Sequence, residues 1–285
     1  MKNKIIIVLS LLLMIVSGYF GREWVIKTNN TQAKIQNSHL KPIIFIPGSS
    51  ATIDRFDSLI ATLNSKGTKH SVLKVQVNTD GHLTYSGRIR ANDQQPFIII
   101  GFQNNNDGYS NIKKQYNWLN IAMNSLQARF HFQNFQAIGH SNGGLIWTGY
   151  LENDYSEDQF HMSVLMTLGT PYNFSEASQT RPTVMLKDYM ERKTNLPNSL
   201  SVYSVAGTED YTDDGVVPVQ SVTAGKYIFQ NQVKTYTQIT VSGSDAEHSS
   251  LPENNEVITL IQEYLLSVPK RGEKIVPKKI TSDIN

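Results

Sequence analysis

The sequence predicts an α/β fold with a mostly parallel central sheet and helices on both of its faces. Short apolar runs, typical of buried strands, alternate along the chain with longer segments of helical periodicity. One apolar run leads directly into the glycine-rich hexapeptide 139–144 and then into a helical pattern. At 285 residues with 39% apolar content, the chain is long enough to bury one large core. We therefore expect one main domain, over residues 40–268.

The elements before the hexapeptide follow one another in regular order. Strand patterns cover residues 41–46, 71–79, 82–88 and 96–102, and helix patterns cover 54–66 and 109–132. Asp80-Gly81 separates two of these strand patterns, and this dipeptide favours a tight hairpin turn. The two strands that flank it are therefore expected to be antiparallel.

The alternation continues around and after the hexapeptide, with one long interruption. Strand patterns cover residues 135–138, 160–168, 201–206 and 235–241, and helix patterns cover 145–151 and 252–266. The segment 170–199 is far longer than the usual connection of about 4–6 residues. We expect it to form a lid insertion, in which Met185 and Tyr189 lie on the apolar side of a short helix over the substrate. The alternative is a surface excursion without contact to substrate.

The hexapeptide Gly139-His140-Ser141-Asn142-Gly143-Gly144 contains the G-x-S-x-G pattern of a nucleophile elbow. This strand-to-helix turn is so tight that the serine needs small residues two positions away on each side. The turn holds the serine hydroxyl at the carboxyl end of the strand, where a base and a substrate can reach it. Ser141 is therefore the predicted nucleophile.

A serine hydroxyl needs an adjacent base, which follows the nucleophile in the chain order of such sites. Five of the seven histidines precede Ser141, and His161 opens a strand pattern too soon after it to leave room for an acid. His248 remains, between the last strand pattern and the last helix pattern. His248 is therefore the predicted base.

The acid that orients this base is expected after the strand pattern 201–206. Four carboxylates compete in the loop that follows: Glu209, Asp210, Asp213 and Asp214. Asp214 is the predicted acid because Gly215 and an apolar pair follow it, so a tight turn can bury its carboxylate beside the imidazole. Asp210, which lies closer to the end of the strand, is the alternative.

Two backbone amides are expected to stabilise the oxyanion of a tetrahedral intermediate. One is the amide of Asn142, directly after the nucleophile. The other is the amide of Ser49, in the turn after the strand pattern 41–46. Many hydrolases have His-Gly in this turn, whereas this chain has Pro47-Gly48, which leaves the backbone donor in place.

Five segments together give the chain a resemblance to a known family: residues 45–50, 139–144, 168–173, 214–221 and 248–254. They resemble the bacterial α/β-hydrolases classed as membrane-bound cell-surface hydrolases, which are distant relatives of the bacterial lipases. The resemblance covers about residues 40–268. It implies the α/β-hydrolase fold and a triad of Ser141, Asp214 and His248.

The two ends of the chain differ from the domain between them. Lys2 and Lys4 precede an apolar run that continues to Phe20, so residues 1–20 are expected to be a signal peptide or an N-terminal membrane anchor. Residues 21–39 form a polar spacer, and 269–285 form a basic tail that we expect to be flexible. The N-terminus therefore predicts an extracytoplasmic protein, secreted or anchored at the bacterial cell surface.

Composition narrows the range of functions. A formal net charge of +2 gives no reason to expect nucleic acid, and the absence of cysteine excludes disulfides and a cysteine nucleophile. The sequence shows no metal-ligand cluster, and we expect no cofactor. The predicted function is a serine hydrolase that cleaves a small-molecule ester or a lipid. A peptidase or amidase, and a surface-anchored binding module on a catalytically vestigial fold, are the alternatives.

Overall fold

The structure is a computed structural model, in which residues 13–14, 16–25, 27, 38–65, 67–178 and 180–266 are described. The expected basic tail and most of the expected signal or anchor segment lie outside these ranges. Residues 16–25 are helical. Within the described ranges, no helix combines the length and the apolar character needed to cross a membrane.

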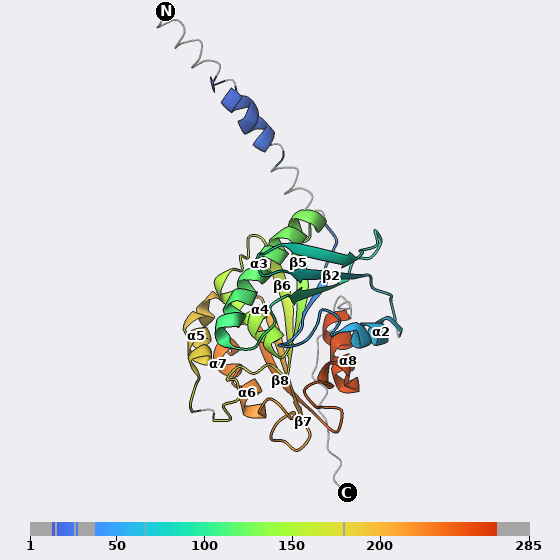
Figure 1. The fold of residues 1–285 in the computed structure, drawn as a ribbon, viewed down its shortest axis with the longest axis vertical. Coiled ribbons are helices and arrows are strands. Elements are labelled where there is room, and N and C mark those ends of the chain that lie inside the picture. Colours follow the sequence, from blue (N-terminus) through green and yellow to red (C-terminus); the bar gives the residue numbers. More distant parts are fainter. Residues whose placement is uncertain are drawn as a thin grey trace, which may run out of the picture.

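An eight-stranded sheet forms the centre of the domain, with strand order β3-β2-β4-β1-β5-β6-β7-β8 (Figure 1). The strands are β1 (Ile43–Ile46), β2 (Val72–Val77), β3 (Leu83–Gly87), β4 (Phe97–Phe102), β5 (Asn134–His140), β6 (His161–Leu168), β7 (Ser201–Thr208) and β8 (Thr235–Ser242). Only the β2–β3 pair, the hairpin around Asp80-Gly81, is antiparallel; every other pair of neighbours is parallel. The predicted α/β fold and its antiparallel edge are thus confirmed.

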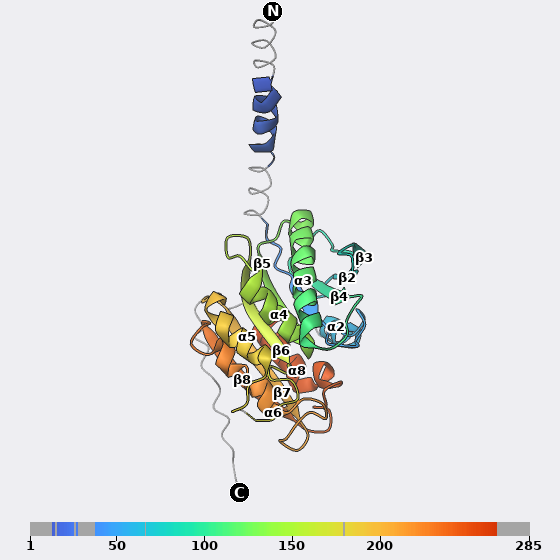
Figure 2. The same ribbon diagram turned by 60° about the vertical axis from the view of Figure 1, so that its left-hand side comes forward.

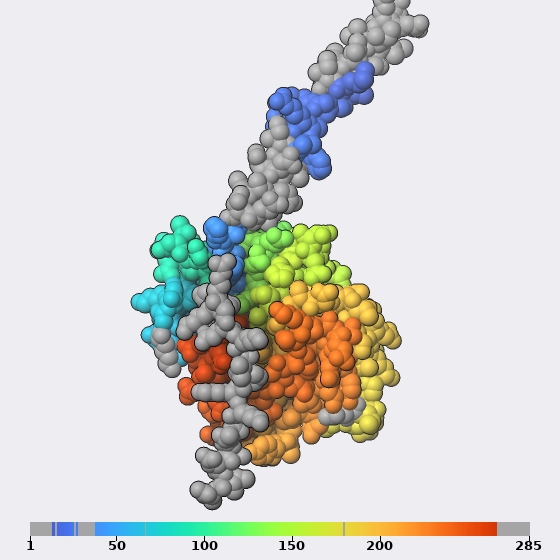
Figure 3. Space-filling view, turned by 180° about the vertical axis from the view of Figure 1, so that it is seen from behind, coloured from blue at the N-terminus to red at the C-terminus, as the bar shows by residue number. Residues whose placement is uncertain are grey.

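The helices lie on both faces of this sheet. They are α2 (Asp57–Ser65), α3 (Tyr109–Phe130), α4 (Asn142–Asn153), α5 (Val184–Arg192), α6 (Val219–Thr223), α7 (Lys226–Phe229) and α8 (Asn255–Ile261), with short helical turns at Lys193–Asn195, Leu251–Glu253 and Gln262–Leu266. Helices α3, α4 and α5 run side by side on one face (Figure 2). The opposite face is covered by α2 and α8, and the C-terminal segments coloured orange and red form much of the back surface in Figure 3.

Strand β1 shows why both faces must be covered. Its residues Ile43 and Phe45 pack into the core beneath α2 and α8, whereas Ile44 and Ile46 pack into the core beneath α3 and α4. All four side chains are fully buried. Because side chains alternate between the two faces of a strand, a continuous apolar run requires a helix layer on each side. The parallel strands place their carboxyl ends at one edge of the sheet, where β5 ends at His140.

The segment 170–199 divides into two parts. Its helix α5 packs against α4, and Met185 and Tyr189 are each only 1% exposed within the main core. The Tyr189 hydroxyl donates a hydrogen bond to the carbonyl of Leu145 in α4, at 2.9 Å. The apolar side of this helix therefore faces the core of the domain, and not a substrate as the sequence suggested. Pro171, Phe174 and Ser175, at the start of the segment, line a cavity beside Ser141.

Candidate active site

Ser141 lies in the turn between β5 and α4, with backbone angles φ 54° and ψ −128°. A non-glycine residue at positive φ is uncommon and is held there by its surroundings. The amide of Ser141 donates to the carbonyl of Leu168 at 2.8 Å, which fastens the turn to the neighbouring strand β6. The sequence pattern thus forms the strand–turn–helix expected of a nucleophile elbow.

The glycines around this turn are required by close backbone contacts. A Cβ atom on Gly143 would lie 2.1 Å from the carbonyl oxygen of Ile46, and one on Gly139 would lie 2.5 Å from the amide nitrogen of Gly144. Neither separation is sterically acceptable, and neither neighbour is a side chain that could move aside. The turn can therefore form only if these positions carry no side chain.

Asp214 and His248 are in direct contact. Asp214 Oδ2 lies 2.7 Å from His248 Nδ1, and the backbone carbonyl of Asp214 accepts a hydrogen bond from the His248 amide at 2.8 Å. The other carboxylate oxygen accepts hydrogen bonds from the amides of Val216 and Val217 at 3.1 and 2.7 Å. Asp214 is only 1% exposed. Its carboxylate is therefore bonded through both oxygens and oriented toward the imidazole.

Two of the competing carboxylates in this loop form other contacts. Asp210 is exposed and binds the amide and hydroxyl of Thr212 through Oδ1. Asp213 accepts a hydrogen bond from the amide of Gly215 at 2.8 Å. Gly169, at φ +56°, leaves room for the Asp214–His248 pair, because a Cβ there would lie 3.0 Å from Asp214 Oδ2 and 3.1 Å from His248 Nδ1. Of the carboxylates Asp210, Asp213 and Asp214, the structure brings Asp214 to the imidazole.

Two further side chains hold the backbone around His248, and the sequence analysis did not assign them this role. His140 Nε2 donates to the carbonyl of His248 at 2.8 Å. Arg55 donates to the carbonyl of Ser249 and forms an ion pair with Glu253, with 2.8 Å between Nη1 and Oε1. Burial lowers the pKa of His140 to about 3, with a smaller contribution from His248, so this ring is neutral. Nothing in the local sequence around Arg55 indicates this contact, because its partners lie almost two hundred positions away.

Two cavities meet at Ser141. One, of about 320 Å³, also contains His248, His140 and Arg55. The other, of about 470 Å³, is lined by Asp107, Tyr109, Phe174 and Asn142 among others. Ser49 and Val216 line both cavities. Ser141 and His248 therefore line the same cavity, which is large enough for a small substrate.

The predicted oxyanion donors lie at this junction. Asn142 is the first residue of α4, so its amide lies in the first turn, where no intrahelical acceptor exists. The partial positive charge at the start of this helix is suited to a developing anion. In the turn after β1, the amide of Ser50 donates to the carbonyl of Asn105 at 3.0 Å, whereas Ser49 lines both cavities.

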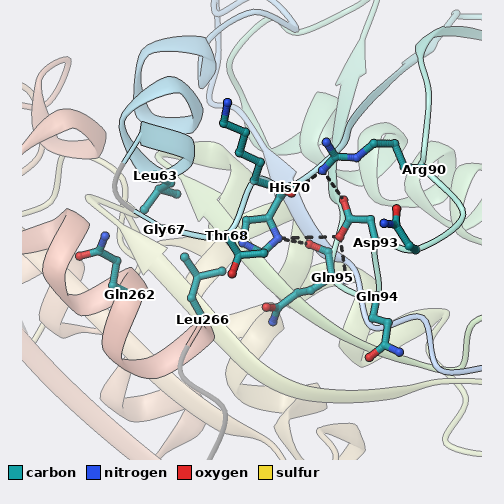
Figure 4. A pocket seen from close by; sticks show the side chains of 12 residues that line it. Leu63, Gly67, Thr68, His70, Arg90, Asp93, Gln94, Gln95, Gln262 and Leu266 are labelled. Atoms are coloured by element: carbon teal, nitrogen blue, oxygen red, sulfur yellow. Dashed lines mark hydrogen bonds and ion pairs between the residues drawn. The ribbon is translucent and has the colours of Figure 1, made fainter.

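A larger cavity, of about 640 Å³, lies at the opposite edge of the sheet, before the starts of β2 and β4 (Figure 4). Asp93, Arg90 and His70 in its wall are held by bonds to one another and to the backbone. Asp93 accepts hydrogen bonds from the amides of Ser71 and Gln95 and lies 3.7 Å from Arg90 Nη2. His70 Nδ1 donates to the carbonyl of Gln95 at 2.6 Å. These contacts fix the connections into β2 and β4, and we assign the polar cluster to structure.

Within the described part of the chain, no group of three or more histidine, aspartate or glutamate residues is arranged to hold a metal ion.

Comparison with known proteins relates this geometry to a family. A candidate cell surface hydrolase from Lactobacillus plantarum WCFS1 is 53% identical, with a TM-score of 0.74 over 81% of this chain and 94% of that chain. A gene product of Listeria innocua is 27% identical, with a TM-score of 0.73 over 81% of this chain and 96% of that chain. No curated protein matches significantly. The profile described as "Alpha/beta hydrolase of unknown function (DUF915)" matches residues 30–268, and the chain therefore belongs to this family of α/β-hydrolases.

Proposed function

We propose that this protein is a serine hydrolase that cleaves carboxylic esters through an acyl-enzyme intermediate. The observation that carries the proposal is the 2.7 Å contact between Asp214 and His248 beside a cavity that His248 shares with Ser141. A neutral imidazole whose Nδ1–H is bound by a carboxylate has an unprotonated Nε2, which is the form needed in a general base.

The chemical steps follow from this arrangement. Ser141 Oγ attacks the ester carbonyl while His248 Nε2 takes its proton, and Asp214 stabilises the resulting imidazolium. The amides of Asn142 and Ser49 bind the oxyanion. The intermediate then collapses, and His248 returns the proton to the departing alcohol. Water, deprotonated by His248, attacks the acyl-enzyme, releases the carboxylic acid and regenerates the Ser141 hydroxyl.

Esters are proposed in preference to amides because an alkoxide leaves more easily than an amide nitrogen. The resemblance to lipase-like hydrolases supports the same choice.

The proposed location is extracytoplasmic, and it is supported by the charged and apolar pattern of residues 1–20 and by the description of the Lactobacillus plantarum protein as a candidate surface hydrolase. Protease treatment of intact cells should digest the domain, and recovery of intact protein in the cytosol would contradict this location.

The activity is tested with p-nitrophenyl esters of graded acyl length and with a fluorophosphonate probe, which labels only an activated serine. The wild-type protein should hydrolyse esters and take up the probe. Ser141→Ala should lose turnover by a factor on the order of 10⁴–10⁶ and should not be labelled, with an unchanged thermal unfolding midpoint. If the folded wild-type protein takes up no probe and cleaves no ester, the fold serves as a binding module and the proposal fails.

A further inference from the structure

The two cavities at Ser141 differ in charge. Asp107 is the only charged residue among those that line the 470 Å³ cavity. The 320 Å³ cavity contains Arg55, whose guanidinium is balanced by the carboxylate of Glu253 at 2.8 Å. One side of the nucleophile therefore presents an unbalanced negative charge, and the other side presents a neutralised ion pair.

The position of His248 decides which part of an ester enters which cavity. His248 must return a proton to the leaving alcohol, so the alcohol has to lie on the side of the imidazole, in the cavity with Arg55. The acyl group then extends from Ser141 into the cavity with Asp107. This assignment rests on the proposed function, because it assumes that Ser141 and His248 carry out acyl transfer.

The Asp107 carboxylate is held in place while remaining accessible. Its Oδ1 accepts hydrogen bonds from the amide of Gly108 and from the side-chain nitrogen of Asn142, both at 2.7 Å. The residue is exposed, and none of the ion pairs among the described residues involves it. A fixed carboxylate without a counter-ion can attract a cation in a substrate.

The bond to Asn142 gives this charge a second effect. The backbone amide of the same Asn142 is the proposed oxyanion donor, so a negative charge held beside it opposes the formation of the oxyanion. A positively charged acyl substituent would offset this repulsion. The benefit of such a substituent is therefore expected in turnover as well as in binding.

Aromatic rings complete the wall of this cavity. Tyr109 and Phe174 both line it, and one face of the Tyr109 ring is covered by Lys113, whose Nζ lies 4.2 Å from the ring centroid. Phe174 has a φ of 50°, and the turn that contains it is fixed by the neighbouring Asn173, which is 1% exposed and binds the amide of Thr183 through Oδ1 at 2.8 Å. An aromatic residue held at positive φ is strained, and such strain is often found where a side chain is held for function. An aromatic ring beside a carboxylate favours ammonium and quaternary ammonium groups, and Phe174 is the ring in this cavity that no cation of the described residues covers.

We propose that the preferred substrates are esters whose acyl group carries an amine or quaternary ammonium, bound by Asp107 beside Phe174. The alcohol side gives no such preference, because the charge of Arg55 is balanced there. The selectivity is thus directional: it depends on the side of the ester bond on which the cation lies.

The test compares matched pairs of esters that differ only in charge. One pair is the p-nitrophenyl ester of γ-trimethylammoniobutyric acid and its isostere with carbon in place of nitrogen. At low ionic strength, the charged member should be cleaved with a kcat/KM about fivefold higher, and added salt should lower this ratio. The second pair, acetylcholine and its carbon isostere, places the charge on the alcohol and should show a ratio close to one.

Asp107→Asn keeps the shape and the acceptor oxygen but removes the charge, so the ratio for the first pair should fall to about one. Asp158→Asn is the matched control: this exposed residue lies before β6, at the opposite edge of the sheet, and should leave the ratio at its wild-type value. Hydrolysis of both first-pair esters at equal rates, or an unchanged ratio in Asp107→Asn, overturns the cation site and leaves the esterase intact. Loss of all ester hydrolysis in the wild-type protein overturns the proposed function instead.

Discussion

His140 donates a hydrogen bond from Nε2 to the backbone carbonyl of His248, across 2.8 Å. His140 is the last residue of β5 and directly precedes Ser141, so this bond joins the neighbour of the proposed nucleophile to the backbone of the proposed base. The ring of His140 is buried, and its pKa of about 3 keeps it neutral under ordinary conditions. A carbonyl can only accept, so the proton of the neutral ring must reside on Nε2.

We therefore expect His140 to position His248 without taking part in proton transfer. His140→Leu removes the donor and should lower kcat by about tenfold or more while changing KM little, because a small displacement of the base impairs catalysis before it impairs binding. His140→Gln retains a donor and should recover part of the loss. Steady-state kinetics with one ester measures both values. Equal losses in the two variants would show that the hydrogen bond is not the cause.

The acid is tested by comparing two carboxylates of one loop. Asp214→Asn should lower kcat by at least about a hundredfold, because the amide cannot stabilise the imidazolium and can favour the wrong tautomer of His248. Asp210→Asn removes an exposed carboxylate whose bonds are to Thr212, and turnover should stay within about twofold of the wild type. The reverse ranking would transfer the role of acid to Asp210.

The sequence was sufficient to predict the alternation of strands and helices, because apolar periodicity reports burial on one or both faces of an element. A local turn pattern and the chain order of such sites also predicted Ser141 as the nucleophile and His248 as the base, and the structure places both beside one cavity. Which acid reaches the imidazole was harder to predict. Asp214 points inward because the amides of Val216 and Val217 bind its other oxygen, and that turn closes only in the folded loop.

Contacts between distant elements could not be read from local patterns. The apolar side of α5 was recognisable, but a sequence does not state whether such a side packs on a substrate or on a neighbouring helix. The structure places Met185 and Tyr189 against the core that includes α4. The contact of Arg55 with the carbonyl of Ser249 belongs to the same class, since it joins segments that are brought together only by the sheet.

The position of α5 leads to an expectation about stability. Met185→Ala should lower the free energy of unfolding by about 2–5 kcal/mol, because it removes a fully buried side chain. Val184 is the matched control on the same helix; it is 70% exposed, and Val184→Ala should change stability by no more than about 0.5 kcal/mol. Denaturant unfolding measures both. If Met185→Ala changes acyl-length preference without loss of stability, α5 covers the substrate after all.

Glu152 gives the protein a specific dependence of stability on pH. This residue of α4 is 3% exposed, and among the described residues neither of its carboxyl oxygens has a hydrogen-bond partner. Burial raises the pKa of Glu152 to about 9, an effect that Arg192 only partly opposes. The folded state therefore holds a proton that the unfolded chain releases above about pH 4.5, the ordinary value for this group.

The pKa of Glu152 is higher in the folded state than in the unfolded chain, so binding of a proton by Glu152 stabilises the folded state. This stabilisation is complete below about pH 4.5 and is lost as the pH rises toward 9. Across this window the free energy of unfolding should fall by up to about 1.4 kcal/mol per pH unit from this group.

Glu152→Gln has no proton to lose, so its denaturant unfolding curves should depend less on pH and should show the larger gain in stability at the alkaline end. Asp154 also has a pKa raised by burial and remains in both proteins, so the difference between them isolates Glu152. The exposed Glu157→Gln serves as a control and should leave the pH dependence unaltered. A Glu152→Gln protein with the same slope as the wild type would mean that this carboxyl group ionises at an ordinary pH in the folded state.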